Sequence, residues 1–464
     1  MQTSLAHNSA MQTSSLLHAP VGSLILRIAM PNMIAMVASG LCAFLDALLL
    51  GAGDARLSAA VSVSFSLLTL IQTLGFTLGM GAGSFVSRSL GRGDKPSAYA
   101  AASTAFFCAL ALSVLLCALG LAFLHPLMRL LGAEADLAAP AGAYARYVLL
   151  SAPLLCTSLV LSSLLRAQGK AMGNMLAFSL GAAAGIPLQL LLVRRLSLGV
   201  NGAGAAMLTR EAVTFTVLLL AVLREKHLVR PSLRSCSLRP IVFVNIMRSG
   251  VPTLVRQGLM SVSSVLLMRA SASFGPSFLS GMGLAVRASS LIAAAAIGFG
   301  QGFAPVFGYA FGAGSMARVS KVYASCQRFV VISLLAVGAF VFLFAHPLLA
   351  RLGQPPEAAA FAASVLRAHS AAFFAQGAVI VMNMLTQAMG LPVRASLIAA
   401  SRQGYILIPL VLILPRVFGA AGLILCQSAS DFISLALSML LTRGAIRGSS
   451  CARGEYSDAR TTSR

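Results

Sequence analysis

The sequence predicts an all-α integral membrane protein with twelve transmembrane helices, arranged as two six-helix lobes related by a parallel pseudo-twofold repeat. The first indication is composition: 58% of the 464 residues are apolar and 10% are charged, whereas water-soluble domains carry about a quarter charged residues. The second is a series of apolar runs long enough to cross a bilayer. The third is a repeat between the two halves of the chain.

The apolar runs predict the individual helices. A helix needs about 20 mainly apolar residues to cross the hydrocarbon core of a bilayer. Runs of this kind fall near 24–50, 57–86, 99–124, 141–166, 172–193, 203–223, 250–271, 279–303, 327–345, 360–388, 396–414 and 420–441. Glycine and proline occur inside them, which bundled membrane helices tolerate because neighbouring groups satisfy the freed backbone.

The two halves of the chain repeat at a constant spacing, which is the same between Pro31 and Pro252 as between Gly169 and Gly390. Six helices per half is an even number, so both halves share one orientation in the membrane, and parallel repeats of this kind are a transporter design. The predicted segments are an N-terminal tail (1–23), an N-lobe (24–223), an inter-lobe linker (224–248), a C-lobe (249–441) and a basic tail (442–464).

The basic residues predict the orientation. The net charge is +23, but Trp is absent and no basic patch with stacking aromatics is visible, which argues against a nucleic-acid partner. With both termini inside, the expected cytoplasmic segments hold 21 Lys and Arg, Arg394 and Arg402 among them, and the opposite loops hold 8. This bias predicts a multi-pass protein of the cell (inner) membrane with both termini in the cytoplasm.

Other classes of protein lack support in the sequence. No nucleophile–base pair, metal-ligand set or phosphate loop is visible, so we expect no enzyme and no metal. The eight cysteines are singletons without metal-ligand spacing. Nothing resembles a selectivity filter or a ring of charges, which argues against a channel.

Glycine-rich helix ends carry a family resemblance. The segments are GMGAGSFVSRSLGRGD (79–94), GFGQGFAPVFGYAFGAG (298–314), MPNMIAMVASGLCAFLDALLLG (30–51), GVPTLVRQGLMSV (250–262) and SRQGYILIPLVLILP (401–415). Together they resemble the multidrug and toxic compound extrusion (MATE) family, in its MepA-like or DinF-like branch. The resemblance implies a secondary antiporter that exports small, often cationic or amphipathic, organic compounds against a proton or sodium gradient.

Small residues and prolines in these motifs have a physical reading of their own. Gly79, Gly81 and Gly83 would let helices approach closely, as small residues do where membrane helices cross. Pro31 removes an internal hydrogen bond and can bend helix 1, and Pro252 stands at the repeat-equivalent position.

Three acids, Asp46, Glu211 and Asp431, lie inside apolar runs. An ionisable group at membrane depth costs at least about 2.5 kcal/mol, so each is a candidate functional residue. Asp46 lies at the position of the family's helix-1 aspartate, which implies the ion-coupling carboxylate. The alternative is a satisfied acid near the outer end of the helix.

Glu211 and Asp431 match one another in the repeat, at a spacing one position shorter than that of the two prolines. Their symmetry suggests one architectural role, either pairing with an arginine or meeting a cationic substrate. The adjacent Arg210 is expected to neutralise Glu211 only indirectly, since neighbours on a helix point about 100° apart.

Two arginines within the apolar runs have two alternative interpretations. Arg256 and Arg287, seven or eight residues into helices 7 and 8, could extend to the membrane surface or fill a polar cavity. In a cavity they would favour the rival function, a flippase-like exporter of an anionic or lipid-linked substrate.

Departures from the family pattern bear on the coupling ion. Where relatives often place an Asn and an Asp in helix 5, this chain has Gly185 and Gln189, and where sodium-using relatives carry a helix-7 Glu it has Met260. These changes remove oxygen ligands that a sodium ion needs. We therefore expect proton coupling through Asp46, with no cofactor. Gln189 stays a candidate cavity residue, and the expected partners are a small-molecule substrate and the lipid bilayer, with the chain acting as a monomer.

Overall fold

The computed structural model describes residues 19–51, 55–131, 135–225, 229–237, 239–350 and 355–461. Side chains are described there except at 43–51, 55–63, 130, 135–139, 350 and 447–461. The described residues form helices and short connections, without a strand in these ranges. The chain divides into two compact units, Met1–Gly250 and Val251–Arg464.

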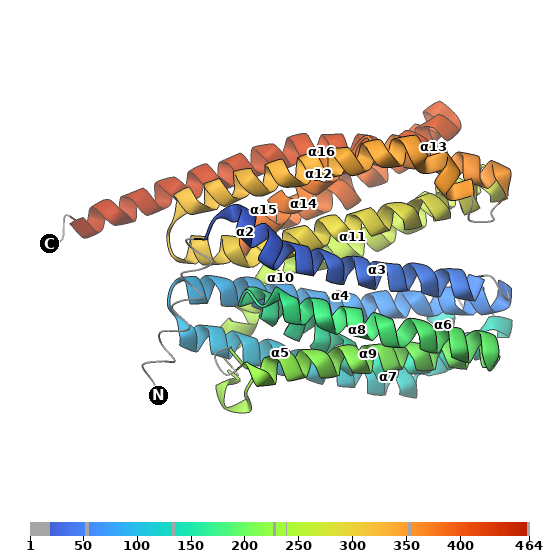
Figure 1. Ribbon diagram of the computed structural model, residues 1–464, viewed down its shortest axis with the longest axis horizontal. Coiled ribbons are helices and arrows are strands. Elements are labelled where there is room, and N and C mark those ends of the chain that lie inside the picture. The colour runs from blue at the N-terminus through green and yellow to red at the C-terminus, as the bar shows by residue number, and fades with distance from the viewer. Residues whose placement is uncertain are drawn as a thin grey trace. The chain divides into compact units, whose positions relative to one another are not determined.

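The first unit is built from α-helices with two short π-helical segments between them. In chain order its elements are α2 (Val21–Leu24), η1 (Ile25–Ala29), α3 (Met30–Gly51), α4 (Ala55–Gly91), α5 (Lys95–Ala122), α6 (Leu124–Leu130), α7 (Ala135–Ala167), α8 (Ala171–Leu190), η2 (Leu191–Arg195) and α9 (Gly199–Arg224). A turn, η3 (Leu233–Ser235), follows, and α8 packs against both α3 and α9 (Figure 1).

The second unit begins inside a helix, α10 (Pro240–Ala272). It continues with α11 (Pro276–Gly312), α12 (Met316–Ala350), α13 (Pro356–Ser370), α14 (Phe373–Ala388), α15 (Pro392–Ala400), η4 (Ser401–Tyr405) and α16 (Leu407–Thr461). Within this unit α11 packs against α13 and α14, and α14 packs against α12, α15 and α16 (Figure 1).

The predicted twelve spans are recovered from these elements. Ten helical segments of the described chain are long and apolar enough to cross a membrane, and α13 with α14 forms an eleventh span bent by 54°. One of the ten, Pro392–Ile446, is two spans joined end to end, because Gly419 interrupts it with a left-handed φ of 57°. The all-α, twelve-helix membrane fold is confirmed.

Helix boundaries repeat at the spacing seen in the sequence. α4 and α11 begin and end at repeat-equivalent positions, and so do the starts of α7 and α13. Turn glycines repeat as well, because Gly93 and Gly314 have φ of 80° and 82°, and Gly169 and Gly390 have 77° and 76°. These left-handed turns favour glycine, which explains why glycines carry the repeat signal.

The expected linker differs from the observed chain. α10 begins at Pro240, so the last part of the segment 224–248 is helical. Described residues of the preceding part are hydrogen-bonded to other residues of the first unit. Gln168 binds both backbone groups of Val229, at 2.5 and 3.3 Å, and Ser103 Oγ accepts from the N–H of Ser232 at 3.0 Å. Residues 229–237, called the strap below, therefore lie against the rest of the first unit.

Glycines 79, 81 and 83 allow close helix packing, as predicted. A Cβ atom at Gly79 would lie 2.8 Å from the carbonyl oxygen of Leu159 on α7, and one at Gly81 would lie 2.2 Å from the carbonyl oxygen of Ile246 on α10. Because both contacts are with backbone oxygens, a side chain at either glycine would force the helices apart. At the first helix, the π-helical η1 directly precedes α3, whose second residue is Pro31. The missing N–H of Pro31 removes the α-helical donor to the carbonyl of Arg27.

Candidate functional site

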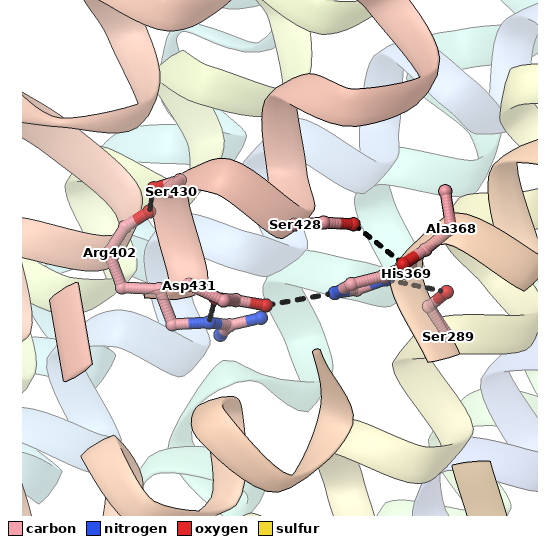
Figure 2. A network of polar contacts seen from close by, with 7 residues as sticks. All are labelled: Ser289, Ala368, His369, Arg402, Ser428, Ser430 and Asp431. Atoms are coloured by element: carbon pink, nitrogen blue, oxygen red, sulfur yellow. Dashed lines mark hydrogen bonds and ion pairs between the residues drawn. The ribbon is translucent and has the colours of Figure 1, made fainter. Parts of the chain in front are cut away.

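Asp431 is the centre of a buried polar network in the second unit (Figure 2). Its side chain is fully buried on α16. One carboxylate oxygen, Oδ1, accepts from Nε of Arg402 at 2.5 Å, and the other, Oδ2, lies 3.1 Å from Nε2 of His369. A buried carboxylate requires such partners, because an unpaired charge in a low-dielectric interior is very costly.

Arg402 reaches Asp431 because η4 interrupts the helix between α15 and α16 with π-helical turns. Ser430 Oγ donates to the carbonyl of Arg402 at 3.0 Å, which fixes the turn against α16. On its other side η4 packs against α10, where Ser263 Oγ donates to the carbonyl of Gln403 and Gly404 meets the side chain of Leu259. Single-turn π-helical insertions of this type are frequent at functional sites.

His369 is presented at the joint between α13 and α14. In a continuous helix the carbonyl of Ala368 would accept from the N–H of Ala372, but that N–H bonds instead to the carbonyl of His369 at 2.9 Å. Ser428 Oγ on α16 takes the freed carbonyl of Ala368 at 2.8 Å. A side chain inserted into the helical hydrogen-bond ladder is a recognised cause of a sharp kink, so α16 holds this joint open.

The second ring nitrogen of His369 also has a partner. Nδ1 lies 3.1 Å from Oγ of Ser289 on α11, so both ring nitrogens of this buried imidazole are engaged (Figure 2). A neutral ring can donate from Nε2 to Asp431 and accept at Nδ1 from Ser289, whereas a charged ring donates from both nitrogens. The network therefore fixes the orientation of the imidazole through both ring nitrogens.

Arg256 lies deeper than the sequence predicts. α10 starts at Pro240 rather than near residue 250, so Arg256 occupies the middle of the helix and not its second turn. Its Nε is fully buried and has no hydrogen-bond partner among the described residues, and the like charge of Arg402 lies close by. Arg256 shares one face of α10 with Leu259 and Ser263, which contact η4.

The other predicted cavity residues are placed separately. Arg287 is exposed on α11, two positions before Ser289, and is not part of the Asp431 network. Gln189 is buried near the end of α8 in the first unit. Pro252 lies inside α10, at the border of the two units.

Glu211 is paired directly with its neighbour, so the expectation of an indirect interaction was wrong. Nε of Arg210 lies 3.3 Å from Oε1 of Glu211. Gly185 on α8 explains the geometry, because a Cβ atom there would lie 2.9 Å from Cβ of Arg210. The bare backbone at Gly185 accommodates the arginine stem, and the long side chain turns back along its own helix.

Asp46 belongs to α3, but its side chain lies outside the described residues. The buried polar side chain in the described part of this helix is Asn32, beside Pro31. Nδ2 of Asn174 donates to Oδ1 of Asn32 at 2.8 Å, and Ser162 Oγ donates to Oδ1 of Asn174 at 2.5 Å. This chain of bonds ties the proline-containing start of α3 to α8 and α7.

The sequence did not indicate that His369, Ser289 and Arg402 belong to the network of Asp431. Arg402 was assigned to a cytoplasmic segment, although it lies within the predicted run 396–414 itself, and that position was the available signal. His369 and Ser289 gave no comparable signal. Within the described residues, no group of three or more His, Cys, Asp or Glu side chains could hold a metal ion.

Comparison with known proteins places this fold in a family. The family model described as MatE matches residues 31–191 and 252–413. The chain is 22% identical to the multidrug export protein MepA of Staphylococcus saprophyticus over 412 residues, which cover 89% of this chain and 91% of the relative. It is 22% identical to MepA of Staphylococcus aureus strain NCTC 8325, covering 91% and 93%.

Solved structures show the same fold. An outward-facing multidrug resistance MATE family transporter of the MOP superfamily superposes with a TM-score of 0.89 at 23% identity, covering 94% of this chain and 98% of that one. A MOP superfamily transporter from Pyrococcus furiosus gives 0.88 at 23% identity with the same coverage.

Proposed function

The chain belongs to the MatE family of membrane transporters, and we propose that it is a secondary antiporter that exports small organic compounds across the cytoplasmic membrane. The observation that carries the proposal is the paired family match, one to each half of a chain whose helix boundaries repeat between the halves. Full-length similarity to MepA multidrug export proteins supports export of cationic or amphipathic compounds.

We propose that a proton drives the exchange and that Asp46 carries it. α3 contributes this carboxylate, while Gly185 and Gln189 on α8 and Met260 on α10 offer few oxygen ligands. A sodium site needs several oxygens at close range, whereas a proton needs one carboxylate. A carboxylate with few further oxygen ligands therefore suits a proton.

The test is export from proteoliposomes across a panel of cationic, neutral and anionic compounds. Asp46→Asn should abolish efflux driven by a pH gradient and leave substrate binding largely intact. Wild-type efflux should not respond to sodium at fixed pH. Sodium-stimulated transport without a pH gradient, or full activity in the Asp46→Asn variant, would contradict proton coupling through this residue.

The proposed orientation places both termini and the segment 224–248 in the cytoplasm, because the positive-inside rule favours that side. Native cysteines provide the probes, since Cys236 is partly exposed in the strap and Cys451 lies in the tail. In intact cells a membrane-impermeant maleimide should label neither residue, and permeabilisation should expose Cys236. Labelling from outside would reverse the orientation.

A second candidate is a flippase-like exporter of an anionic or lipid-linked substrate through Arg256 and Arg287. The buried, unpartnered Nε of Arg256 favours an anion. The exposed position of Arg287 does not give the same support to an anion-binding role. The same panel separates the candidates: transport restricted to anions, with loss in Arg256→Gln and Arg287→Gln alike, would support the flippase.

A further inference from the structure

The interior of the second unit holds more positive than negative charge. Between residues 251 and 446 the sequence contains two acids, Glu357 and Asp431. Glu357 is exposed at the start of α13, where its Oε2 accepts from Ser277 Oγ at 3.1 Å. Asp431 is therefore the one interior acid of this range, and among the described residues it pairs with Arg402 and not with Arg256.

The hydrogen-bond donors of these two arginines are also in excess. A guanidinium carries five N–H donors. Among the described residues, Arg402 uses only Nε, toward Asp431, and Arg256 makes no side-chain hydrogen bond to any described group. Both terminal nitrogens of each arginine are therefore available to a ligand. A buried donor without a partner is costly, so the buried Nε of Arg256 also favours an occupant at this site.

The first unit contains a buried arginine whose guanidinium has hydrogen-bond partners. Arg166 on α7 is 4% exposed and also has no carboxylate partner among the described residues. Its guanidinium nevertheless donates to Ser162 and, at 2.8 Å, to Ser163, and it approaches the sulfur of Met80 at 3.9 Å. Arg256 has no such contacts among the described residues, so neutral hydrogen-bond acceptors do not stabilise its guanidinium as they do that of Arg166.

The packing of α10 against η4 brings the two arginines to one place. Leu259 and Ser263 contact η4, and Arg256 lies three and seven residues before them on the same face. Arg402 is a residue of η4 itself. The pair therefore presents planar, fork-shaped donors that suit an oxyanion, with Asp431 as a competing internal anion.

We propose that Arg256 and Arg402 form an anion subsite in the second unit, which binds the carboxylate or phosphate of an amphipathic substrate in competition with Asp431. The inference rests on the export function proposed above and deepens it by naming a substrate class. Arg287 plays no part in this subsite, which separates it from the flippase arrangement.

Equilibrium binding to the purified full chain in detergent tests the subsite, with two probes that share one ring system. Radiolabelled 2-naphthoate carries the anion, and 2-naphthylmethylammonium is the matched cation. Arg256→Gln should weaken naphthoate binding about 10- to 100-fold, the range for lost hydrogen bonds to a charged group, and leave the ammonium probe unchanged. Arg256→Lys should lose less, because it keeps the charge but not the fork.

Two further variants separate a binding role from a structural one. Arg269→Gln, at an exposed position of the same helix, should bind naphthoate like the wild type. Asp431→Asn should bind naphthoate more tightly, because it removes the competing carboxylate; an effect on folding alone would not produce this gain. Equal losses in Arg256→Gln and Arg269→Gln, or weaker binding in Asp431→Asn, would overturn the proposal.

Lipid phosphate offers the same chemistry as a soluble anion. Competition of naphthoate binding by phosphatidylglycerol would assign the subsite to a lipid headgroup, and lack of competition would assign it to a soluble substrate; both support an oxyanion site. Binding does not depend on transport. A chain that binds naphthoate through Arg256 but fails to export any compound would refute the antiporter and leave the subsite standing.

Discussion

The two units of this protein contain one acid at the same repeat position and surround it differently. In the first unit Glu211 pairs with Arg210, the preceding residue of its own helix, at 3.3 Å. In the second unit Asp431 is held by Arg402 from η4 and by His369 from α13. The contact between Arg210 and Glu211 lies within one helix, whereas the contacts of Asp431 join three elements across the interior of the second unit.

The residues behind this difference stand at equivalent places in the repeat. Where the second unit has Arg402, His369 and Arg256, the first has Gly181, Val148 and Ala35. The backbone differs accordingly, because α7 is continuous while α13 and α14 meet at an angle of 54°. One scaffold therefore supports a tightly packed glycine interface in one unit and a charged interior in the other.

The largest difference is expected when the acids are removed. Asp431→Ala should lower the free energy of unfolding in mixed micelles by about 3–5 kcal/mol, because it leaves Arg402 buried without its counter-charge. Glu211→Ala should cost less, because Arg210 and Glu211 keep 17% and 11% of their side chains exposed, whereas Asp431 is fully buried. Equal costs would show that the two acids are equivalent in kind.

Repeat-equivalent glycines should also respond unequally. A Cβ atom at Gly79 would meet the carbonyl oxygen of Leu159 at 2.8 Å, whereas one at Gly300 would meet side chains of Ile380 and Met384 at 3.1 Å. Side chains yield more readily than backbone. Gly79→Ala should cost about 1–3 kcal/mol, as overpacking does, and Gly300→Ala less than about 1 kcal/mol. Thermal unfolding of both variants provides the measurement, and a costlier Gly300→Ala would refute this packing account.

The joint between α13 and α14 should depend on Ser428. Ser428→Ala removes the hydroxyl that binds the carbonyl of Ala368, at a cost of about 1 kcal/mol for one hydrogen bond. The freed carbonyl can then accept from the N–H of Ala372 and straighten the joint. Spin-label distances across α13 and α14 should lengthen relative to wild type, with Ser364→Ala, an exposed serine of α13, as control. An unchanged bend would exclude Ser428 as its cause.

An effect that depends on pH is expected at the start of α5. Asp94 caps this helix, and hydrogen bonds from the side chain and N–H of Ser97 lower the pKa of its carboxyl below the ordinary value. The resulting stability is present above the unfolded-state pKa and is lost as pH falls through the lower folded-state pKa. Asp94→Ala should cost about 1 kcal/mol at pH 7 and little at acidic pH. A cost independent of pH would contradict capping by the charged form.

The sequence predicted the scaffold well and the charged interior only in part. Apolar runs and the repeat between the halves determine helix number and order, because spanning length and turn glycines leave direct marks in the sequence. Asp431 was found because a membrane-depth acid is rare. His369 and Arg402 were not paired with it, since contacts between residues 29 and 62 positions apart depend on a π-helical turn and a broken helix that no local pattern indicates.

We propose that the two units have different roles: Asp46 of the first unit couples export to the proton, and the Asp431 network of the second unit binds charge. Substrate-dependent proton flux in proteoliposomes tests it most directly, with Asp46→Asn and Asp431→Asn compared in parallel. We expect Asp46→Asn to abolish proton flux and Asp431→Asn to keep the wild-type ratio of protons to substrate. Loss of proton flux in Asp431→Asn together with its persistence in Asp46→Asn would contradict the claim.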